Sequence, residues 1–239
     1  MSAIRPSRHV FSALVLSLAL AGCAARGSVE NPVSRIATWF DYLGAGDIHT
    51  ACKDGAPDRY RFVYNGIYHE QVRTYEINPN PVFSGGTVEA RAFNPLNLTM
   101  LDYNSLNIFL RGVVSRQPID GPGLAELDRA LAADADATRA PKDTFLRSDR
   151  FYWTVGACRS GRFYYAGFAD TLPGFEGLRF PAILVRYDTT GVKVNPSRKL
   201  DNDFFNSSDY SDRKQAIQGG PVKFFQQLDE NGLKQSPLF

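Results

Sequence analysis

The sequence predicts an α+β fold, mainly β, in which about seven or eight largely antiparallel strands form a barrel or a sandwich with flanking helices. Aromatic residues are abundant, with 17 Phe and 11 Tyr among 239 residues, and aromatic side chains fit strands better than helices. Short apolar runs also recur between turn-forming residues, which is typical of antiparallel sheets. We expect a single globular domain over residues 31–239, with a two-domain arrangement broken near residues 121–149 as the alternative.

Residues 1–22 have the order of a secretory signal peptide. Arg5 and Arg8 precede an apolar run over residues 10–21, and small residues end that run. The run is shorter than the roughly 20 residues that a membrane-spanning helix needs. The segment therefore predicts export of the mature protein.

The residues around the expected cleavage site are Leu20, Ala21, Gly22 and Cys23, and this run resembles the lipobox of bacterial lipoproteins. The resemblance implies that the leader is cut before Cys23, that Cys23 is acylated with palmitate-type chains, and that residues 23–30 form a tether. Ala24 lacks the Asp-type cue for inner-membrane retention, so the resemblance implies an outer-membrane anchor with the domain facing the periplasm. The inner membrane and the cell surface are the alternatives.

Removing the leader makes the mature chain formally neutral. Lys and Arg together fall from 27 to 25 because Arg5 and Arg8 are lost, and Asp and Glu together stay at 25. Nucleic-acid proteins and polybasic membrane binders need a surplus of positive charge. We therefore expect no nucleic-acid partner, and the lipid on Cys23 is the membrane attachment that the sequence predicts.

Two cysteines, Cys52 and Cys158, remain after Cys23 is assigned to lipid. An even number of cysteines in an exported protein favours a disulfide. The alternatives are two free thiols, or a nucleophilic Cys158 with His49 or His69 as its base.

The first half of the domain is predicted to hold a helix and an aromatic hairpin. Asn31 and Pro32 suit the start of a helix that Gly44 would end. Residues 59–64 and 67–77 are strand-like and flank Asn65-Gly66, a dipeptide that favours a two-residue type I′ turn. That turn would place Arg61 opposite Glu70 and His69 opposite Phe62.

Further strands are predicted over residues 86–93, 106–115, 151–158, 162–169, 180–187 and 192–194, and the runs 151–158 and 162–169 would form a second hairpin around residues 159–161. Leu124, Leu127 and Leu131 predict a helix after Gly121, followed by a surface loop over residues 132–143. Residues 195–212 resemble loop in composition, a short helix is expected after Ser211, and a last helix is predicted over residues 221–230.

The candidate sites for chemistry are few. Zinc needs three or four close Cys, His or carboxylate ligands, and with His49 and His69 alone after the leader we expect no metal and no cofactor. Asp201, Asn202, Asp203, Asp209 and Asp212 could line a calcium site, although a solvated loop is the favoured interpretation. The aromatic runs 151–153, 164–165 and 204–205 could stack ligands, but a role in the core is the default.

The favoured function is a non-enzymatic binding or assembly module of the cell envelope, whose ligand, protein partner and catalytic residues the sequence does not name. The alternatives are a hydrolase that acts on envelope material and a lipocalin-like carrier with an apolar cavity. Converging polar side chains in a pocket would indicate binding or catalysis, and a dry apolar cavity would indicate the carrier.

Overall fold

The computed structural model describes residues 40–68, 70–80, 82, 84–93, 112–200 and 225–234. The chain divides into two compact units, Met1–Trp39 and Phe40–Phe239, and all described residues belong to the second. Cys23, the signal peptide, the tether and most of the helix expected from Asn31 lie outside the described residues. The described end of that helix, residues 40–43, is helical, and the chain turns at Gly44 as expected.

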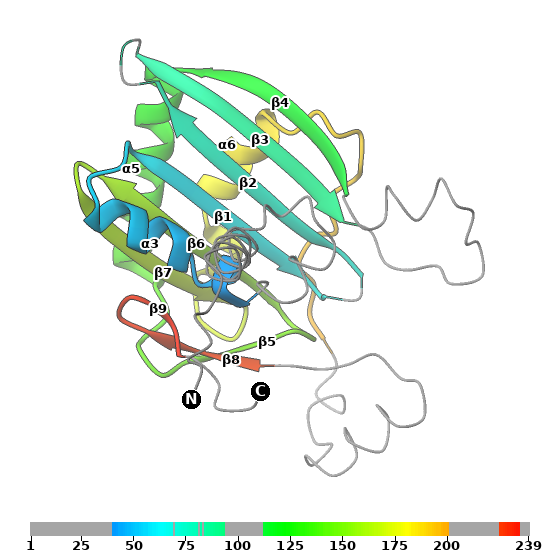
Figure 1. Ribbon diagram of the computed structural model, residues 1–239. Helices are drawn as coiled ribbons and strands as arrows, with labels where there is room; N and C mark the ends of the chain where they lie inside the picture. The colour runs from blue at the N-terminus through cyan, green and yellow to red at the C-terminus, as the bar shows by residue number, and fades with distance from the viewer. Residues whose placement is uncertain are drawn as a thin grey trace, which may run out of the picture. The chain divides into compact units, whose positions relative to one another are not determined.

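The centre of the structure is an open antiparallel sheet of six strands in the order β4-β3-β2-β1-β6-β7 (Figure 1). Its members are β1 Arg59–Gly66, β2 Val72–Pro79, β3 Gly85–Phe93, β4 Val113–Asp120, β6 Phe151–Arg159 and β7 Arg162–Ala169. A small sheet, β5-β8-β9, contains β5 Phe145–Arg147, β8 Phe225–Asp229 and β9 Gly232–Leu233. The predicted class, α+β and mainly β with antiparallel strands and flanking helices, is confirmed, although the large sheet is open where we expected a barrel or a sandwich.

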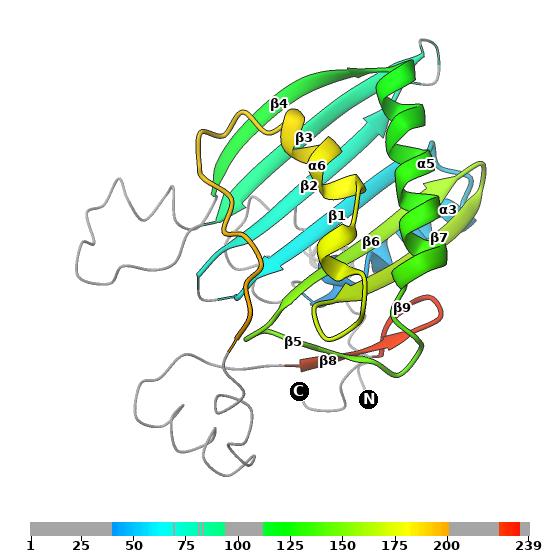
Figure 2. The same cartoon turned by 180° about the vertical axis from the view of Figure 1, so that it is seen from behind.

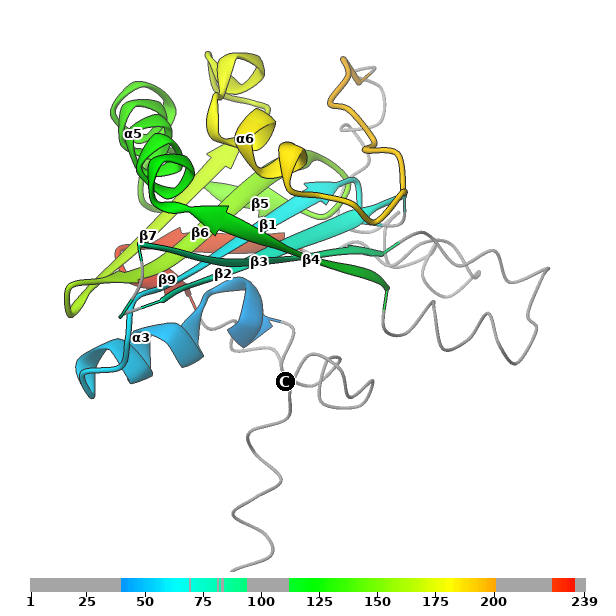
Figure 3. The same ribbon diagram turned by 90° about the horizontal axis from the view of Figure 1, so that it is seen from above.

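Helices cover both faces of the large sheet (Figures 2 and 3). The helices α5 Gly121–Thr138 and α6 Phe180–Arg186, with the short η2 Phe175–Gly177 before α6, lie on one face, and α3 Gly46–Lys53 lies on the other. The core between the sheet and α5 and α6 is aromatic, as the composition suggested. Its largest members are Tyr60, Phe62, Tyr64, Tyr75, Phe151, Trp153, Phe168 and Phe180.

The predicted disulfide is confirmed and joins α3 to β6. Cys52 and Cys158 have their Cα atoms 5.5 Å apart and are separated by 106 residues. Near the disulfide, the start of α3 packs directly on β6. A Cβ on Gly156 would lie 2.2 Å from the Cβ of Ala45. Only glycine therefore lets the start of α3 come this near to the sheet.

The first hairpin exists, but the predicted turn was wrong. Asn65 and Gly66 belong to β1, where Asn65 lies opposite Val72 of β2 and both residues also pair with β6. The turn begins at Ile67, whose φ is 63°, and the residue facing Arg61 is Glu76 instead of Glu70. Pairing with a third strand draws Asn65 and Gly66 into the sheet, and the side-chain amide of Asn65 donates to the carbonyls of Ser148 and Arg150.

The second hairpin is confirmed, with Ser160 and Gly161 as its turn at φ values of 49° and 73°. Strand β3 is confirmed as well. The strand predicted over residues 106–115 lies largely outside the described residues, and its described end belongs to β4, which continues to Asp120. Pro118 is tolerated in β4 because this is an edge strand.

Three other predictions were wrong. Helix α5 continues through the predicted loop to Thr138, because its alanines are good helix formers and Asp134 is buried, with its carboxylate accepting hydrogen bonds from the amides of Arg179 and Phe180. The apolar run that begins at Phe180 is helix α6, with Pro181 in its first turn, and residues 192–194 form no strand. The predicted last helix is, in its described part, the hairpin of β8 and β9.

Candidate functional site

A row of four charged residues crosses the face of the sheet on which α3 lies. The register places Arg61 of β1 opposite Glu76 of β2, Glu76 opposite Glu89 of β3, and Glu89 opposite Arg116 of β4. Two carboxylates therefore lie side by side on neighbouring strands, which is an arrangement that acid–base enzymes use.

Each of these two carboxylates is clamped by two guanidinium groups. Glu76 accepts from Arg61 Nε at 2.5 Å and from Arg59 Nη2 at 2.7 Å. Glu89 accepts from Arg91 Nε at 2.7 Å and from Arg116 Nε at 2.6 Å. Because both carboxylates are engaged in charge-assisted hydrogen bonds within the sheet, the row is best understood as an ion-pair network that holds four strands together.

Arg61 is the centre of this network, with only 2% of its surface exposed. Its Nη1 donates to Asp47 Oδ1 at 2.6 Å and to the carbonyl of Tyr42 at 3.1 Å, and its guanidinium lies 3.7 Å from the centre of the Tyr42 ring. Burial by itself would raise the pKa of Asp47, but the hydrogen bonds and positive charge of Arg61, with a contribution from Arg59, hold that pKa below its ordinary value. The network thus fixes α3 to the sheet independently of the disulfide.

A second buried network holds the segment that follows α6 against the opposite face. Arg73 is 1% exposed; its guanidinium donates to Asp188 Oδ2 and to the carbonyl of Val192, and Tyr75 donates to the same carboxylate oxygen at 3.0 Å. Burial would raise the pKa of Asp188, but hydrogen bonds from Thr190, together with Arg73 and Tyr75, lower it. This carboxylate is also fully used in the fold.

The structure does not contain the predicted alternative of a nucleophilic Cys158 with a histidine as its base. Cys158 is in a disulfide and 2% exposed, so it cannot act as a nucleophile. His49 stacks on Phe163 with ring centres 4.4 Å apart, and burial, together with the nearby Lys53, lowers its pKa. His69 lies outside the described residues, but its predicted position opposite Phe62 is wrong, because Tyr75 of β2 lies opposite Phe62.

The other predicted site residues, namely the aromatic runs and the possible calcium ligands, lie either in the core or outside the described residues. Phe151, Tyr152, Trp153 and Tyr165 are buried, which confirms the default interpretation of those aromatic runs. The aromatic run at residues 204–205 and the possible calcium ligands, Asp201, Asn202, Asp203, Asp209 and Asp212, lie outside the described residues. Among the described residues no cluster of three or more His, Cys, Asp or Glu is placed to hold a metal.

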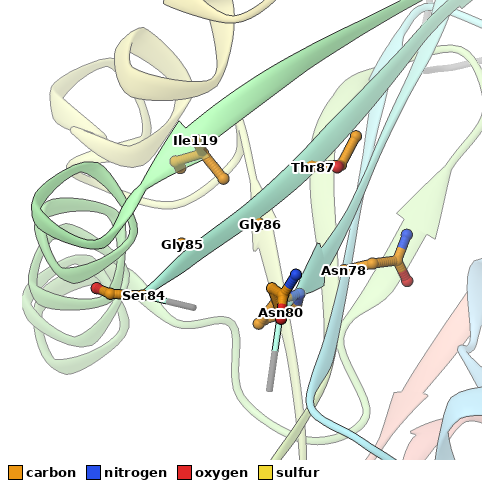
Figure 4. Close-up of a pocket in the computed structure, with 8 residues that line it drawn as sticks. Asn78, Asn80, Ser84, Gly85, Gly86, Thr87 and Ile119 are labelled. Atoms are coloured by element: carbon orange, nitrogen blue, oxygen red, sulfur yellow. The ribbon is translucent and has the colours of Figure 1, made fainter. Parts of the chain in front are cut away.

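A hollow lies at the end of the sheet where the β2–β3 hairpin turns, and we call it the hairpin hollow (Figure 4). Its volume is about 420 Å³, and it is lined by Asn78, Pro79, Asn80, Ser84, Gly85, Gly86, Thr87 and Ile119. Figure 4 shows Gly85 and Gly86 between Ser84 and Thr87 along β3, with Asn78 and Asn80 on the neighbouring strand end.

Glycine is required in the wall of the hairpin hollow. Gly85 has a φ of +120°, and a Cβ there would lie 2.4 Å from the carbonyl oxygen of Ile119. A Cβ on Gly86 would lie 2.5 Å from the carbonyl oxygen of Asn78. The three strand ends therefore approach closely, and the described side chains around them supply amides and hydroxyls and no ionisable group.

Sequence analysis did not identify this hollow. Asn, Pro, Ser and Gly around residues 78–87 are ordinary turn formers, and nothing in their order separates a hollowed hairpin end from a plain turn. The available signal was the pair Gly85-Gly86 at the start of a strand, which is a position where backbone segments often approach closely.

No helix in the described part of the chain is long and apolar enough to span a membrane. Comparison of the chain with known proteins finds no matching family model, no matching curated protein and no matching solved structure.

Proposed function

We propose that the protein is a lipid-anchored envelope protein, acylated at Cys23 and exported to the periplasm, whose domain is a non-enzymatic binding module. The lipobox-like run that ends in Cys23 supports the anchor. The disulfide between Cys52 and Cys158 supports export, because such bonds persist in oxidising compartments and are rare in the cytosol.

The hairpin hollow is the observation on which the proposed binding function rests. Its polar side chains, those of Asn78, Asn80, Ser84 and Thr87, are uncharged and offer both donors and acceptors. A volume of about 420 Å³ suits a small ligand or one or two sugar units. The proposed ligand class is a neutral, hydroxyl-rich molecule, namely a saccharide of the cell envelope.

The same lining argues against the two alternatives. A hydrolase would need a general acid or base at the hollow, and the described residues of its lining include no ionisable side chain. The paired carboxylates Glu76 and Glu89 are engaged by arginines elsewhere on the sheet. A carrier of apolar ligands would need an apolar cavity, whereas four of the eight described lining residues carry amides or hydroxyls.

The binding test is a titration of the protein with oligosaccharides of N-acetylglucosamine, followed by backbone amide NMR. We expect shifts confined to residues 78–87 and 119. Thr87→Ala and Asn78→Ala should each weaken binding about two- to tenfold, the equivalent of one hydrogen bond of about 0.5–1.5 kcal/mol. Thr171→Ala, an exposed change in the turn after β7, is the control and should leave binding unchanged.

The proposed ligand class is wrong if saccharide produces no shifts at residues 78–87, or if Thr171→Ala weakens binding as much as Thr87→Ala does. The anchor has a separate test. Intact mass of the membrane-extracted protein should show an acylated Cys23 as the first residue, and Cys23→Ser should abolish the lipid.

A further inference from the structure

Two phenylalanines lie exposed together on the small sheet. Phe145 of β5 is 55% exposed and Phe225 of β8 is 59% exposed. Their ring centres are 5.9 Å apart with the rings nearly perpendicular. Scattered exposed apolar residues are common, but two large aromatic side chains that touch each other and remain mostly in water are not explained by packing. We call this pair the aromatic patch.

The small sheet has one buried face and one outer face. Leu146, Gln226 and Leu228 are buried, and a Cβ on Gly167 would lie 2.6 Å from Leu228 Cδ1, so this face sits directly on β7. Because side chains alternate along a strand, Phe145 and Phe225 project from the outer face.

The small sheet also lies where the chain enters the domain. A Cβ on Gly44 would lie 3.4 Å from the amide nitrogen of Leu233 in β9, and the amide of Gly44 donates to the carbonyl of Phe40, the first described residue. Cys23 precedes Phe40 by 17 residues. A chain anchored at Cys23 therefore reaches the folded domain beside β9, an edge strand of the small sheet that carries the aromatic patch.

The charged groups around the patch are internally paired. Lys142 binds Asp229 at 3.1 Å and Glu230 at 3.3 Å, Arg147 binds Asp149 at 2.9 Å, and Lys234 binds Asp143. With three basic and four acidic groups in these pairs, the described residues of the rim carry no positive surplus that would select anionic lipid. A contact with a membrane would therefore depend on the aromatic side chains.

We propose that Phe145 and Phe225 insert into the interfacial region of the bilayer to which Cys23 anchors the protein. This inference rests on the proposed lipid anchor. Trp and Tyr are enriched at the membrane interface, and Phe is among the apolar residues that interfacial amphipathic helices bury about 5–10 Å into the headgroup boundary. The lipid supplies the attachment, and the aromatic patch fixes which side of the domain faces the membrane.

Fluorescence quenching tests the insertion. The acylated full-length Phe225→Trp variant is reconstituted into phosphatidylcholine vesicles, with and without bromine on the upper acyl chain, and compared with wild type to subtract Trp39 and Trp153. We expect the added tryptophan to shift its emission to shorter wavelength and to be quenched by the brominated lipid. Phe145→Trp should behave in the same way.

Val82→Trp is the matched control, because Val82 is 78% exposed and belongs to the β2–β3 hairpin, which lies far from the small sheet (Figure 1). Its tryptophan should not be quenched. Equal quenching at positions 82 and 225, or none at 225 and 145, overturns the proposal. A lipid-independent blue shift of the 225 tryptophan that rises with protein concentration also overturns it, because a second copy would then cover the patch.

Failure of the insertion and failure of the anchor give different results. Intact mass and flotation with the vesicles report the lipid on Cys23, whereas quenching reports the aromatic patch. A protein that is acylated and floats but shows no quenching at position 225 retains its anchor and refutes the insertion.

Discussion

Replacing Arg61 by Ala should destabilise the domain far more than an ordinary ion-pair deletion. The side chain is 2% exposed and joins Asp47 of α3, Glu76 of β2 and the carbonyl of Tyr42. Removing one partner of a buried ion pair costs about 3–5 kcal/mol, because the remaining charge stays buried without compensation.

The lower end of that range applies to Arg61. Arg59 still binds Glu76 at 2.7 Å after the change, and the Asp47 side chain is 44% exposed, so water compensates part of its charge. We therefore expect a loss of about 3 kcal/mol. With an m value of about 2 kcal/mol/M, the urea midpoint should fall by about 1.5 M.

The assay is equilibrium urea unfolding of the oxidised protein, with Arg116→Ala as the matched control. Arg116 occupies the other end of the same charged row, binds Glu89 at 2.6 Å and is 61% exposed. An exposed ion pair is worth under about 1 kcal/mol, so this variant should lose little. Similar losses for the two variants would refute the argument that burial at Arg61 sets the cost.

Three further predictions concern the disulfide, the second hairpin and acid stability. Reduction of Cys52–Cys158 should cost about 4–5 kcal/mol for a loop of this size, seen as a lower urea midpoint with reductant present. Gly161→Ala should lower the free energy of unfolding by about 1–2 kcal/mol, because the φ of Gly161 is +73° although a Cβ there would meet no neighbour. Gly177 also has free space around it but no positive φ, so Gly177→Ala should change stability by under about 0.5 kcal/mol. Equal effects of the two substitutions would contradict the turn at Ser160-Gly161. Because the folded pKa of Asp188 is lowered from 3.8, its contribution is present above about pH 4 and is lost as the pH falls further. Asp188→Asn should therefore flatten the loss of the urea midpoint between pH 4 and pH 2.5, and an unchanged pH dependence would refute this role.

Local chemistry predicted the features that depend on few residues. The pairing of Cys52 with Cys158 followed from cysteine number and compartment, and the turn at Ser160-Gly161 followed from the glycine between two aromatic runs. Asn65-Gly66 has a stronger turn composition, yet it lies inside β1 because β6 pairs with it from the other side. A sequence reading that pairs two strands at a time cannot include the third strand, which here decides the register.

Periodicity also could not settle the short apolar runs. The apolar side chains of Phe180–Arg186 could be buried against the sheet as a strand or as a helix. Pro181 favours the helix, and so does the carboxylate of Asp134, which accepts hydrogen bonds from two amides at the helix start. Asp134 lies 46 residues away from Phe180. The hairpin hollow has the same origin, since it forms where three strand ends meet and no single segment encodes it.

The proposed ligand site and the proposed membrane contact lie far apart, since the small sheet lies beyond the edge strand β7 and the β2–β3 hairpin lies at the top of the view in Figures 1 and 2. The small sheet with Phe145 and Phe225 lies beside the point of chain entry, and the β2–β3 hairpin lies far from it. A domain held at the bilayer by Cys23 and by the aromatic patch would therefore direct the hairpin hollow away from the membrane. For an anchor in the periplasmic leaflet, that direction is where the glycan of the envelope is found. The two proposals thus support each other in geometry while remaining separable by experiment.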